Sequence, residues 1–433
     1  MIPITSWGRL SHDDHLLVTL QELNKAASLI ANGRGRPGIA HGMGRSYGDV
    51  ALNPDGVLWQ TTNLDHFISF DESTGRLTCE AGVLLRDIQK QFIPRGWALP
   101  VTPGTQMVTV GGAIANDIHG KNHHLLGSFG DHVTHIKLVR TTGEQIECSA
   151  KQNPEWFAAT VGGLGLTGVI LSAQIQLRPV AGPWLDTESI PYSNLTEFFQ
   201  LADSSEKDWE YTVSWVDCMS SKGRGIFMRA NHSTCNEASP SIKPSKTMPL
   251  VPPFSLVNNI TLRPFNSAYY TLNKLTAGTG VVHYEPFFYP LDKLLEWNRI
   301  YGPKGFFQYQ SVVPRSVGQD ATDAMLKEIK KSGEGSFLAI LKTFGNRHSV
   351  GMLSFPEPGV TLALDFPNHG AHTHKLFERL DAIIREAKGR IYPAKDARMP
   401  HDLFEAGYPK LNEFLHYRDP GISSSLSRRL MGS

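Results

Sequence analysis

Residues 103–130 read PGTQMVTVGGAIANDIHGKNHHLLGSFG, a glycine-rich stretch with several polar side chains. It joins two adjacent glycines, Gly111 and Gly112, to a polar cluster that includes His119 and Lys121. Glycine lets backbone N–H groups come close to a phosphate, and the polar side chains then face the reacting part of the ligand. We therefore expect this stretch to hold a large, phosphate-bearing ligand.

Two further glycine-rich loops flank that stretch, HGMGRSYGD at residues 41–49 and VGGLGLTG at residues 161–168. The first is not a Walker A loop, because no GK[ST] follows, and it is not the GxGxxG of a nicotinamide-binding fold. Its glycines permit positive φ angles, and Ser46 and Tyr47 add hydroxyl groups. Three such loops in one α+β half predict a dinucleotide cofactor, which we expect to be a flavin.

The composition is that of a globular protein, with 433 residues, 40% hydrophobic and 19% charged, which is enough for two or three domains. A formal net charge of +1 provides no field to attract nucleic acid. No run approaches the about 18 apolar residues of a transmembrane helix, and the N-terminus lacks the pattern of a secretory signal. We expect a cytoplasmic protein, with peripheral membrane contact as the alternative.

The sequence offers little support for a metal site. Four scattered cysteines without a CxxC pair predict reduced, structural thiols: Cys79, Cys148, Cys218 and Cys235. The run HGKNHH at residues 119–124 lacks the HExxH pattern and the carboxylate partners of a zinc site. We therefore expect no metal, and we expect His123 and His124 to be surface or supporting residues.

Hydrophobic spacing predicts the main elements. Helices are expected over residues 14–31, 83–92, 291–297 and 374–387, and strands over 37–40, 57–60, 67–70, 77–81 and 169–178, with a hairpin at 133–148. The proline-rich residues 239–253 are expected to form a mobile flap.

Three segments of the C-terminal half carry polar residues in apolar surroundings. In FQYQ (residues 307–310) the alternation of a strand places Gln308 and Gln310 on one face. Asp365 interrupts an apolar strand, so it needs a partner, either in a salt bridge or in a pocket. In YPAKD, Lys395 follows Tyr392, and a lysine there would suit the pyrimidine end of a flavin.

Together, GMGRSYGD, residues 103–130, TVGGLGLTG, PLDKLLEWNRIYGPKGFFQYQ and YPAKDAR resemble one family, the FAD-dependent decaprenylphosphoryl-β-D-ribose 2-oxidases of the vanillyl-alcohol-oxidase superfamily. The resemblance implies an α+β fold, in which a two-subdomain PCMH-type FAD-binding domain carries an inserted antiparallel-sheet substrate domain. The implied boundaries are residues 1–182 and 385–433 for the FAD-binding domain and residues 183–384 for the substrate-binding domain.

The resemblance also implies roles for individual residues. The implied cofactor-binding positions are Gly42, Gly44, Arg45, Ser46, Tyr47, Gly104, Thr105, Thr109, Val110, Gly111, Gly112, Asn116, Asp117, Ile118, His119, Gly165, Ile170, Tyr392 and Lys395. The implied substrate-binding positions are Lys121, Gln308, Gln310, Thr361, Ala363 and Asp365. The implied catalytic positions are Lys395, Tyr47, His119 and Lys121. Lys395 and Lys121 are candidates for the cation that would stabilise the reduced flavin. Lys395, Tyr47 and His119 all remain candidates for the base that would take the hydroxyl proton of the substrate.

The reaction implied by the resemblance is oxidation of the ribose 2-hydroxyl of a polyprenyl-phosphoryl-β-D-ribose to a 2-keto sugar, by hydride transfer to flavin N5. In the family, a partner short-chain keto-reductase completes a 2-epimerisation toward an arabinose donor for the cell wall. Covalent flavin in the superfamily usually needs a histidine where this chain has Arg45, so we expect non-covalent FAD. Ala363 and Thr361 replace a cysteine and an asparagine of the family, which leaves open a flavin oxidase of a soluble alditol, aldonolactone or nucleoside sugar.

Overall fold

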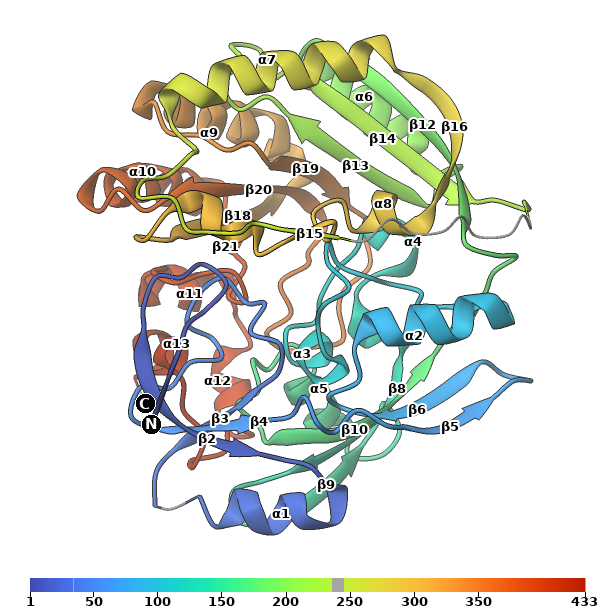
Figure 1. Cartoon of the computed structure of the whole chain (residues 1–433), viewed down its shortest axis with the longest axis vertical. Coiled ribbons are helices and arrows are strands. Elements are labelled where there is room, and N and C mark those ends of the chain that lie inside the picture. The colour runs from blue at the N-terminus through green and yellow to red at the C-terminus, as the bar shows by residue number, and fades with distance from the viewer. Residues whose placement is uncertain (34, 236–244, 433) are drawn as a thin grey trace.

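The computed structural model describes residues 1–33, 35–235 and 245–432, and its strands form three large sheets (Figure 1). The first sheet has the order β1 (Ile2–Ile4), β2 (Asp13–Thr19), β4 (Val57–Gln60) and β3 (Gly38–His41), with β4 parallel to β2 and β3. The second sheet is antiparallel, with the order β5 (Phe67–Asp71), β6 (Arg76–Glu80), β10 (Val169–Gln176), β8 (Val133–Val139) and β9 (Gln145–Cys148).

The third sheet has eight antiparallel strands, in the order β16 (Gly278–His283), β12 (Trp184–Tyr192), β14 (Gly225–His232), β13 (Tyr211–Val216), β19 (Ala339–Phe344), β20 (Gly359–Pro367), β18 (Phe306–Pro314) and β21 (Arg390–Ile391). Helices α6 (Leu195–Ser205), α9 (Gly318–Ser332) and α10 (Ala371–Glu386) cover one face of it. Helix α7 (Asn259–Leu275) packs on the other face, since Phe227 of β14 contacts α6 while its neighbour Ile226 packs with Tyr270 of α7.

Shorter elements connect the sheets. The remaining helices are α1 (Leu23–Ala31), α2 (Leu85–Phe92), α3 (Val110–Ala115), α4 (His123–Leu126), α5 (Pro154–Thr160), α8 (Tyr284–Phe288), α11 (His401–Gly407), α12 (Leu411–Leu415) and α13 (Ser425–Met431). Two small ribbons pair β7 (Trp97–Ala98) with β11 (Arg178–Pro179), and β15 (Lys246–Thr247) with β17 (Leu294–Leu295). Turns of 3₁₀ helix cover Ile93–Arg95, Phe129–His132, Trp297–Tyr301 and Arg315–Val317.

The C-terminal helices α11 to α13 return to the first sheet, near the N-terminus in Figure 1. The N–H of Ser423 donates to the carbonyl of Gly38 in β3 at 2.9 Å. The buried carboxylate of Asp419 accepts hydrogen bonds from the N–H and hydroxyl of Thr141, at 2.7 and 2.5 Å, and lies 3.7 Å from Nε of Arg140. Arg140 and Thr141 lie in the turn between β8 and β9. Through these contacts the C-terminal segment links the first sheet to the second.

The helix predicted over residues 14–31 is wrong in its first half. Residues Asp13–Thr19 form β2, which lies parallel to β4 with Leu16 opposite Val57, and α1 begins only at Leu23. A short apolar run is compatible with a strand as well as with a helix. Here the pairing with β4 selects the strand. The predicted helix at 83–92, the strands of this half and the hairpin are confirmed, with ends that differ by one or two residues.

The helix predicted over residues 291–297 is also wrong, whereas that at 374–387 is confirmed within α10. Residues Leu294–Leu295 pair instead with β15. Of the predicted flap, residues 239–244 lie outside the described residues. The described part is held by backbone hydrogen bonds from the N–H of Lys246 to Lys293 and from the N–H of Met248 to Leu295, both 2.9 Å long.

Among the described residues, no helix combines the length and the apolar character that crossing a bilayer requires. The longest described helix, α7, has 17 residues, and it contains Arg263 and Lys274.

Asp419→Ala is expected to lower the free energy of unfolding by about 3–5 kcal/mol, because it removes one partner of a buried charged network. Urea denaturation measures this loss. Asp402→Ala is the matched control, since the side chain of Asp402 is 68% exposed in its ion pair with Arg385, and such surface pairs contribute at most about 1 kcal/mol. Equal losses in the two variants would contradict the proposed structural role of Asp419.

Candidate active site

A cavity of about 620 Å³ lies where the glycine-rich loops meet the third sheet. Its walls come from residues 42–47 after β3, from the stretch around α3, from strands β13, β14, β18, β19 and β20, and from residues 392–395 after β21. A volume of this size is typical of a site for a large ligand. The cavity therefore combines two distant parts of the chain in one site.

The first glycine-rich loop presents unused backbone donors. The carbonyls of Ser46 and Tyr47 accept hydrogen bonds from the N-terminal segment, at 2.9 and 3.1 Å. In contrast, none of the N–H groups of residues 43–47 donates to a backbone carbonyl of the described chain. Because the loop lines the cavity, this row of N–H groups suits an anion such as a pyrophosphate.

The glycine pair lies in the first turn of α3, where it packs against neighbouring backbone and also lines the cavity. The N–H of Gly111 donates to the carbonyl of Ala81 at 2.8 Å, so this amide is not free to bind a phosphate. The N–H of Gly112 donates to the side chain of Thr109, the N-cap of α3, at 3.2 Å. A Cβ added at Gly42 would lie 2.6 Å from Oγ1 of Thr109, so glycine there lets the first loop pack against α3.

Asp117, which the resemblance places at the cofactor, does not line the cavity. Its carboxylate is fully buried, and it accepts hydrogen bonds from the hydroxyl of Ser128 and the N–H of Gly130, both at 2.8 Å, and from the hydroxyl of Ser354. Burial raises the pKa of Asp117 to about 6. With a φ of 38°, Asp117 fixes the turn that precedes His119.

His119 lines the cavity with one ring nitrogen engaged and the other unused. The Nε2 atom lies 3.0 Å from Nε2 of Gln310, whose amide donates. The proton of the neutral ring is therefore assigned to Nδ1. Burial, followed by the charge of Lys342, lowers the pKa of His119 well below its ordinary value. Since Nδ1 has no hydrogen-bond partner among the described residues, it remains available to donate to a ligand.

The alternation expected for FQYQ is confirmed, because Gln308 and Gln310 both line the cavity from β18. In the register of β18 and β20, Gln310 is opposite Ala363 and Gln308 is opposite Asp365. Asp365 itself does not line the cavity, but it accepts a hydrogen bond from Nε2 of Gln308 at 2.6 Å. Burial raises the pKa of Asp365.

Lys395 and Tyr47 lie together at the cavity. The ammonium of Lys395 is 4.2 Å from the centroid of the Tyr47 ring. Burial lowers the pKa of Lys395 to about 8, and the charge of Asp365 opposes this shift. Burial raises the pKa of Tyr47 well above its ordinary value. Lys395 therefore changes its protonation state close to neutral pH, whereas Tyr47 keeps its proton.

Two further lysines line the cavity, and sequence reasoning missed one of them. The ammonium of Lys121 donates to the carbonyls of Phe287 and Phe288, at 2.9 and 3.0 Å. Lys342 of β19 is the missed residue, and it donates to the carbonyl of Gly120 at 3.0 Å. Burial lowers the pKa of both lysines to about 7. A lysine inside the apolar strand AILKTF is the signal that would have found Lys342.

Most of the site residues expected from the sequence meet at this one cavity. Those that line it are Gly42, Gly44, Arg45, Ser46, Tyr47, Gly104, Thr105, Thr109, Gly111, Gly112, Asn116, Ile118, His119, Lys121, Gly165, Ile170, Gln308, Gln310, Thr361, Ala363, Tyr392 and Lys395. Val110, Asp117 and Asp365 do not line it. Asp292 and Trp297 do, but they were missed because a helix was expected over residues 291–297.

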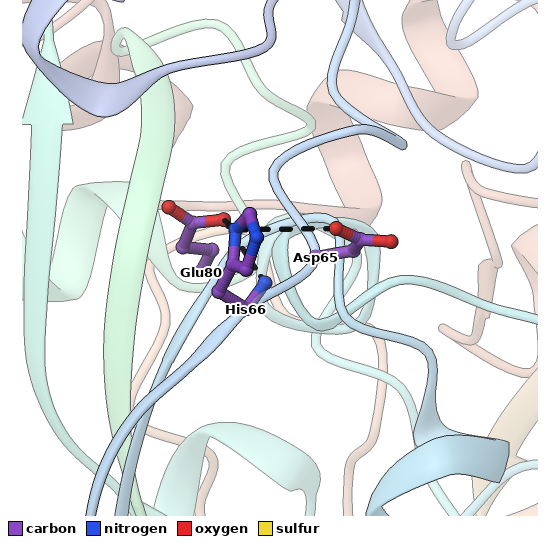
Figure 2. Close-up of side chains that lie close together, drawn as sticks. All are labelled: Asp65, His66 and Glu80. Atoms are coloured by element: carbon purple, nitrogen blue, oxygen red, sulfur yellow. Dashed lines mark hydrogen bonds and ion pairs between the residues drawn. The ribbon is translucent and has the colours of Figure 1, made fainter.

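A histidine between two carboxylates lies away from this cavity, in the β5–β6 hairpin (Figure 2). It is the one group of three candidate metal ligands that the described residues bring within 4.8 Å. Nδ1 of His66 lies 2.9 Å from Oε2 of Glu80, which also accepts the His66 N–H, and 4.0 Å from Asp65. An ion pair between His66 and Glu80 at the open end of the hairpin explains these contacts. His66 and Asp65 are exposed. We therefore assign no metal to this group.

Comparison with known proteins indicates a flavin cofactor. The FAD binding domain model matches residues 16–149. The chain is 35% identical to decaprenylphosphoryl-β-D-ribose oxidase of Mycolicibacterium smegmatis, over 99% of this chain and 97% of the relative. It is 32% identical to an uncharacterised protein of Streptomyces coelicolor, over 80% of this chain and 100% of that protein. Mouse L-gulonolactone oxidase is 34% identical, over 39% of this chain and 38% of its own length.

The cofactor of the chain is FAD, and the residues present fit it. Besides the unused N–H groups of residues 43–47, four side-chain atoms of cavity-lining residues are buried without a partner in the described chain: Nε of Arg45, Oδ1 of Asn116, Nδ1 of His119 and Oε1 of Gln308. They offer two donors and two acceptors to a polar ligand. Gly104 lines the cavity, and a Cβ added there would meet no atom within 4 Å.

Gly104→Ala is expected to raise the Kd for FAD roughly tenfold while leaving the melting temperature of the apoprotein unchanged, because overpacking a well-fitted contact costs about 1–3 kcal/mol. Fluorescence titration of the apoprotein with FAD measures the Kd. Gly280→Ala is the control, since its Cβ also meets nothing within 4 Å and Gly280 does not line the cavity. Unchanged FAD affinity in Gly104→Ala would show that the cofactor does not contact this residue.

Proposed function

The chain belongs to the decaprenylphosphoryl-β-D-ribose oxidase family, and on this premise we propose that it oxidises the 2-hydroxyl of a polyprenyl-phosphoryl-β-D-ribose to a 2-keto sugar. The chain is an FAD-dependent oxidoreductase. The observation that carries the proposed substrate is a change in the cavity lining across the third sheet. Polar side chains from β18 and β20 line one part of the cavity, apolar side chains from β13 and β14 line another, and Thr187, Glu188 and Ser189 of β12 line it beyond β14.

The polar side suits a phosphorylated sugar. Gln308 and Gln310 present amides from β18, and Thr361 adds a hydroxyl from β20. Three lysines line the cavity: Lys121, Lys342 and Lys395. Burial lowers the pKa of all three, so each protonated lysine is costly until an anion approaches. A substrate phosphate would supply that anion.

The apolar side suits a prenyl chain. Trp215 and Val213 line the cavity from β13, and Met228 lines it from β14. Leu294 and Leu295 of β17 continue this lining to the surface, where they are 38% and 39% exposed. A free alditol or lactone would leave this apolar side in water, whereas a prenyl chain would cover it. The lining therefore favours a lipid-linked sugar over the soluble alternative.

FAD supplies the acceptor for the hydride that leaves the sugar carbon. The sugar hydroxyl must also lose a proton, and we assign the base to Lys395. Its pKa of about 8 lets the neutral amine form near neutral pH. Tyr47 stays protonated, and His119 holds its proton on Nδ1 with a pKa too low for an effective base. Once protonated, Lys395 would also provide a cation that could stabilise the negative charge of a reduced flavin.

Several finer features belong to the same proposal. We propose non-covalent FAD, since the guanidinium of Arg45 lies 4.0 Å over the ring of Trp7 at the position where a histidine would be needed. We propose the two-subdomain FAD-binding domain over residues 1–182 and 385–433, and the substrate domain over residues 183–384. Seven strands of the third sheet lie between Trp184 and Pro367, β21 joins that sheet from the C-terminal segment, and α11 to α13 return to the first sheet. A keto-reductase would complete the epimerisation.

An anaerobic absorbance titration tests the substrate. A farnesylphosphoryl-β-D-ribofuranose is expected to bleach the bound flavin, and acid is expected to release that flavin from the protein. Free ribose, alditols and aldonolactones serve as controls and should leave the spectrum unchanged. Bleaching by the soluble sugars alone would overturn the proposed substrate and favour a soluble-sugar oxidase.

Lys395→Ala is expected to lower kcat by about 10²–10⁴, the usual contribution of a general base, with FAD still bound. In the unmodified enzyme, activity should rise with pH through about 8, because the amine must be neutral to accept a proton. Stopped-flow flavin reduction across this pH range measures both effects. A rate that falls as the pH rises would exclude Lys395 as the base.

The variant Asp365→Asn tests whether Lys395 acts as the base or only stabilises the structure. Asp365 raises the pKa of Lys395 by its charge, so removing that charge should move the rising limb of the pH profile to lower pH. Asp402→Asn, a change at an exposed carboxylate on α11, is the control and should leave the profile in place.

A further inference from the structure

Exposed apolar side chains gather around α7. Ten of the nineteen large apolar side chains that are exposed in the described chain lie within residues 250–295. On α7 itself, Ile260 is 85% exposed, Leu272 63% and Leu275 79%. Scattered single apolar residues are normal on a surface, but a contiguous patch marks an interaction site.

The apolar residues of α7 occupy one side of the helix. Ile260, Pro264, Ala268 and Leu272 follow one another at intervals of four residues, and all are exposed. The side of α7 that packs on the third sheet carries Leu262, Asn266 and Tyr270, also four residues apart and buried. The outward side is therefore an apolar stripe that no described element covers. Figure 1 shows α7 at the outer edge of the molecule.

Both charged side chains of α7, Arg263 and Lys274, are basic. No aspartate or glutamate occurs between Glu237 and Glu285 in the sequence. The described residues of that interval include Lys246, Arg263 and Lys274. An apolar stripe with basic flanks is the composition of a helix that lies in the headgroup region of an anionic bilayer. A second copy of this chain would bring like charges together, which disfavours self-association at this face.

Helix α7 also reaches the cavity. Tyr269 of α7, Val282 of β16 and Leu295 of β17 all line the cavity. Leu295 is also exposed. A molecule that passes from α7 into the cavity would therefore meet the apolar Val282 and the ring of Tyr269, beside the polar Thr187, Glu188 and Ser189 of β12.

We propose that the outward face of α7, with residues 250–256, docks the protein on an anionic lipid bilayer, from which the prenyl chain of the substrate enters the cavity. Docking itself follows from the exposed stripe and its charge. Delivery of the substrate rests on the proposed function. The bilayer surface would cover the apolar side chains that the fold leaves in water.

The test uses flotation of the full-length holoenzyme with vesicles of phosphatidylcholine containing phosphatidylglycerol. The variant Ile260→Ser/Leu272→Ser/Leu275→Ser is expected to weaken vesicle binding at least about tenfold, because three apolar side chains no longer enter the interface. Arg263→Gln/Lys274→Gln should weaken it by about fivefold for each charge removed, and vesicles of phosphatidylcholine alone should bind the unmodified protein more weakly.

The matched control is Leu29→Ser/Ile68→Ser/Leu415→Ser, which removes three exposed apolar side chains distant from α7 in the sequence and should leave vesicle binding unchanged. Bleaching by a water-soluble, short-chain prenylphosphoryl-ribose should be the same in all variants. Absence of vesicle binding with normal bleaching would overturn the docking proposal alone. Vesicle binding without bleaching would overturn the proposed substrate alone. A lipid-free dimer that the α7 variant dissociates would assign the face to a second copy instead.

Discussion

The buried carboxylate of Asp117 is the constraint on which the geometry of the cavity depends. A carboxylate without solvent is costly unless donors surround it, and here Ser128, Gly130 and Ser354 provide them. Two of these donors lie in the same glycine-rich stretch and the third lies more than two hundred residues later. The network therefore folds the stretch back on itself and joins it to the C-terminal half. His119, two residues after Asp117, receives its position from this turn.

The second constraint is the register of the third sheet. Side chains alternate between the two faces of a strand, so a slip of one residue would exchange the faces. In the antiparallel pairing of β18 with β20, Gln310 lies opposite Ala363 and Gln308 lies opposite Asp365. In β19, Lys342 is opposite Thr361. The register thus determines which side chains of β18, β19 and β20 face the cavity, and the glycine-rich stretch meets these strands through the contact of His119 with Gln310.

Local patterns predicted much of this site. The glycine-rich loops and the alternation of FQYQ depend on neighbours in sequence, and the structure places their predicted residues at one cavity. The helix predicted over residues 291–297 and the first half of the helix predicted over residues 14–31 were wrong because the deciding contacts are distant: β17 pairs with β15, and β2 with β4. Lys342 was missed for a similar reason, since only the pairing of β19 with β20 brings that lysine to the cavity.

By itself, the sequence determined the residue types that a flavin enzyme requires: loops that accept positive φ, backbone near phosphate, and titratable side chains in apolar strands. Only the tertiary structure decided which of these groups meet and in what protonation state. The pKa of Lys395 is low because burial removes its water, and the charge of Asp365 limits that shift. Burial and proximity arise from contacts between residues far apart in the chain, which local patterns do not specify.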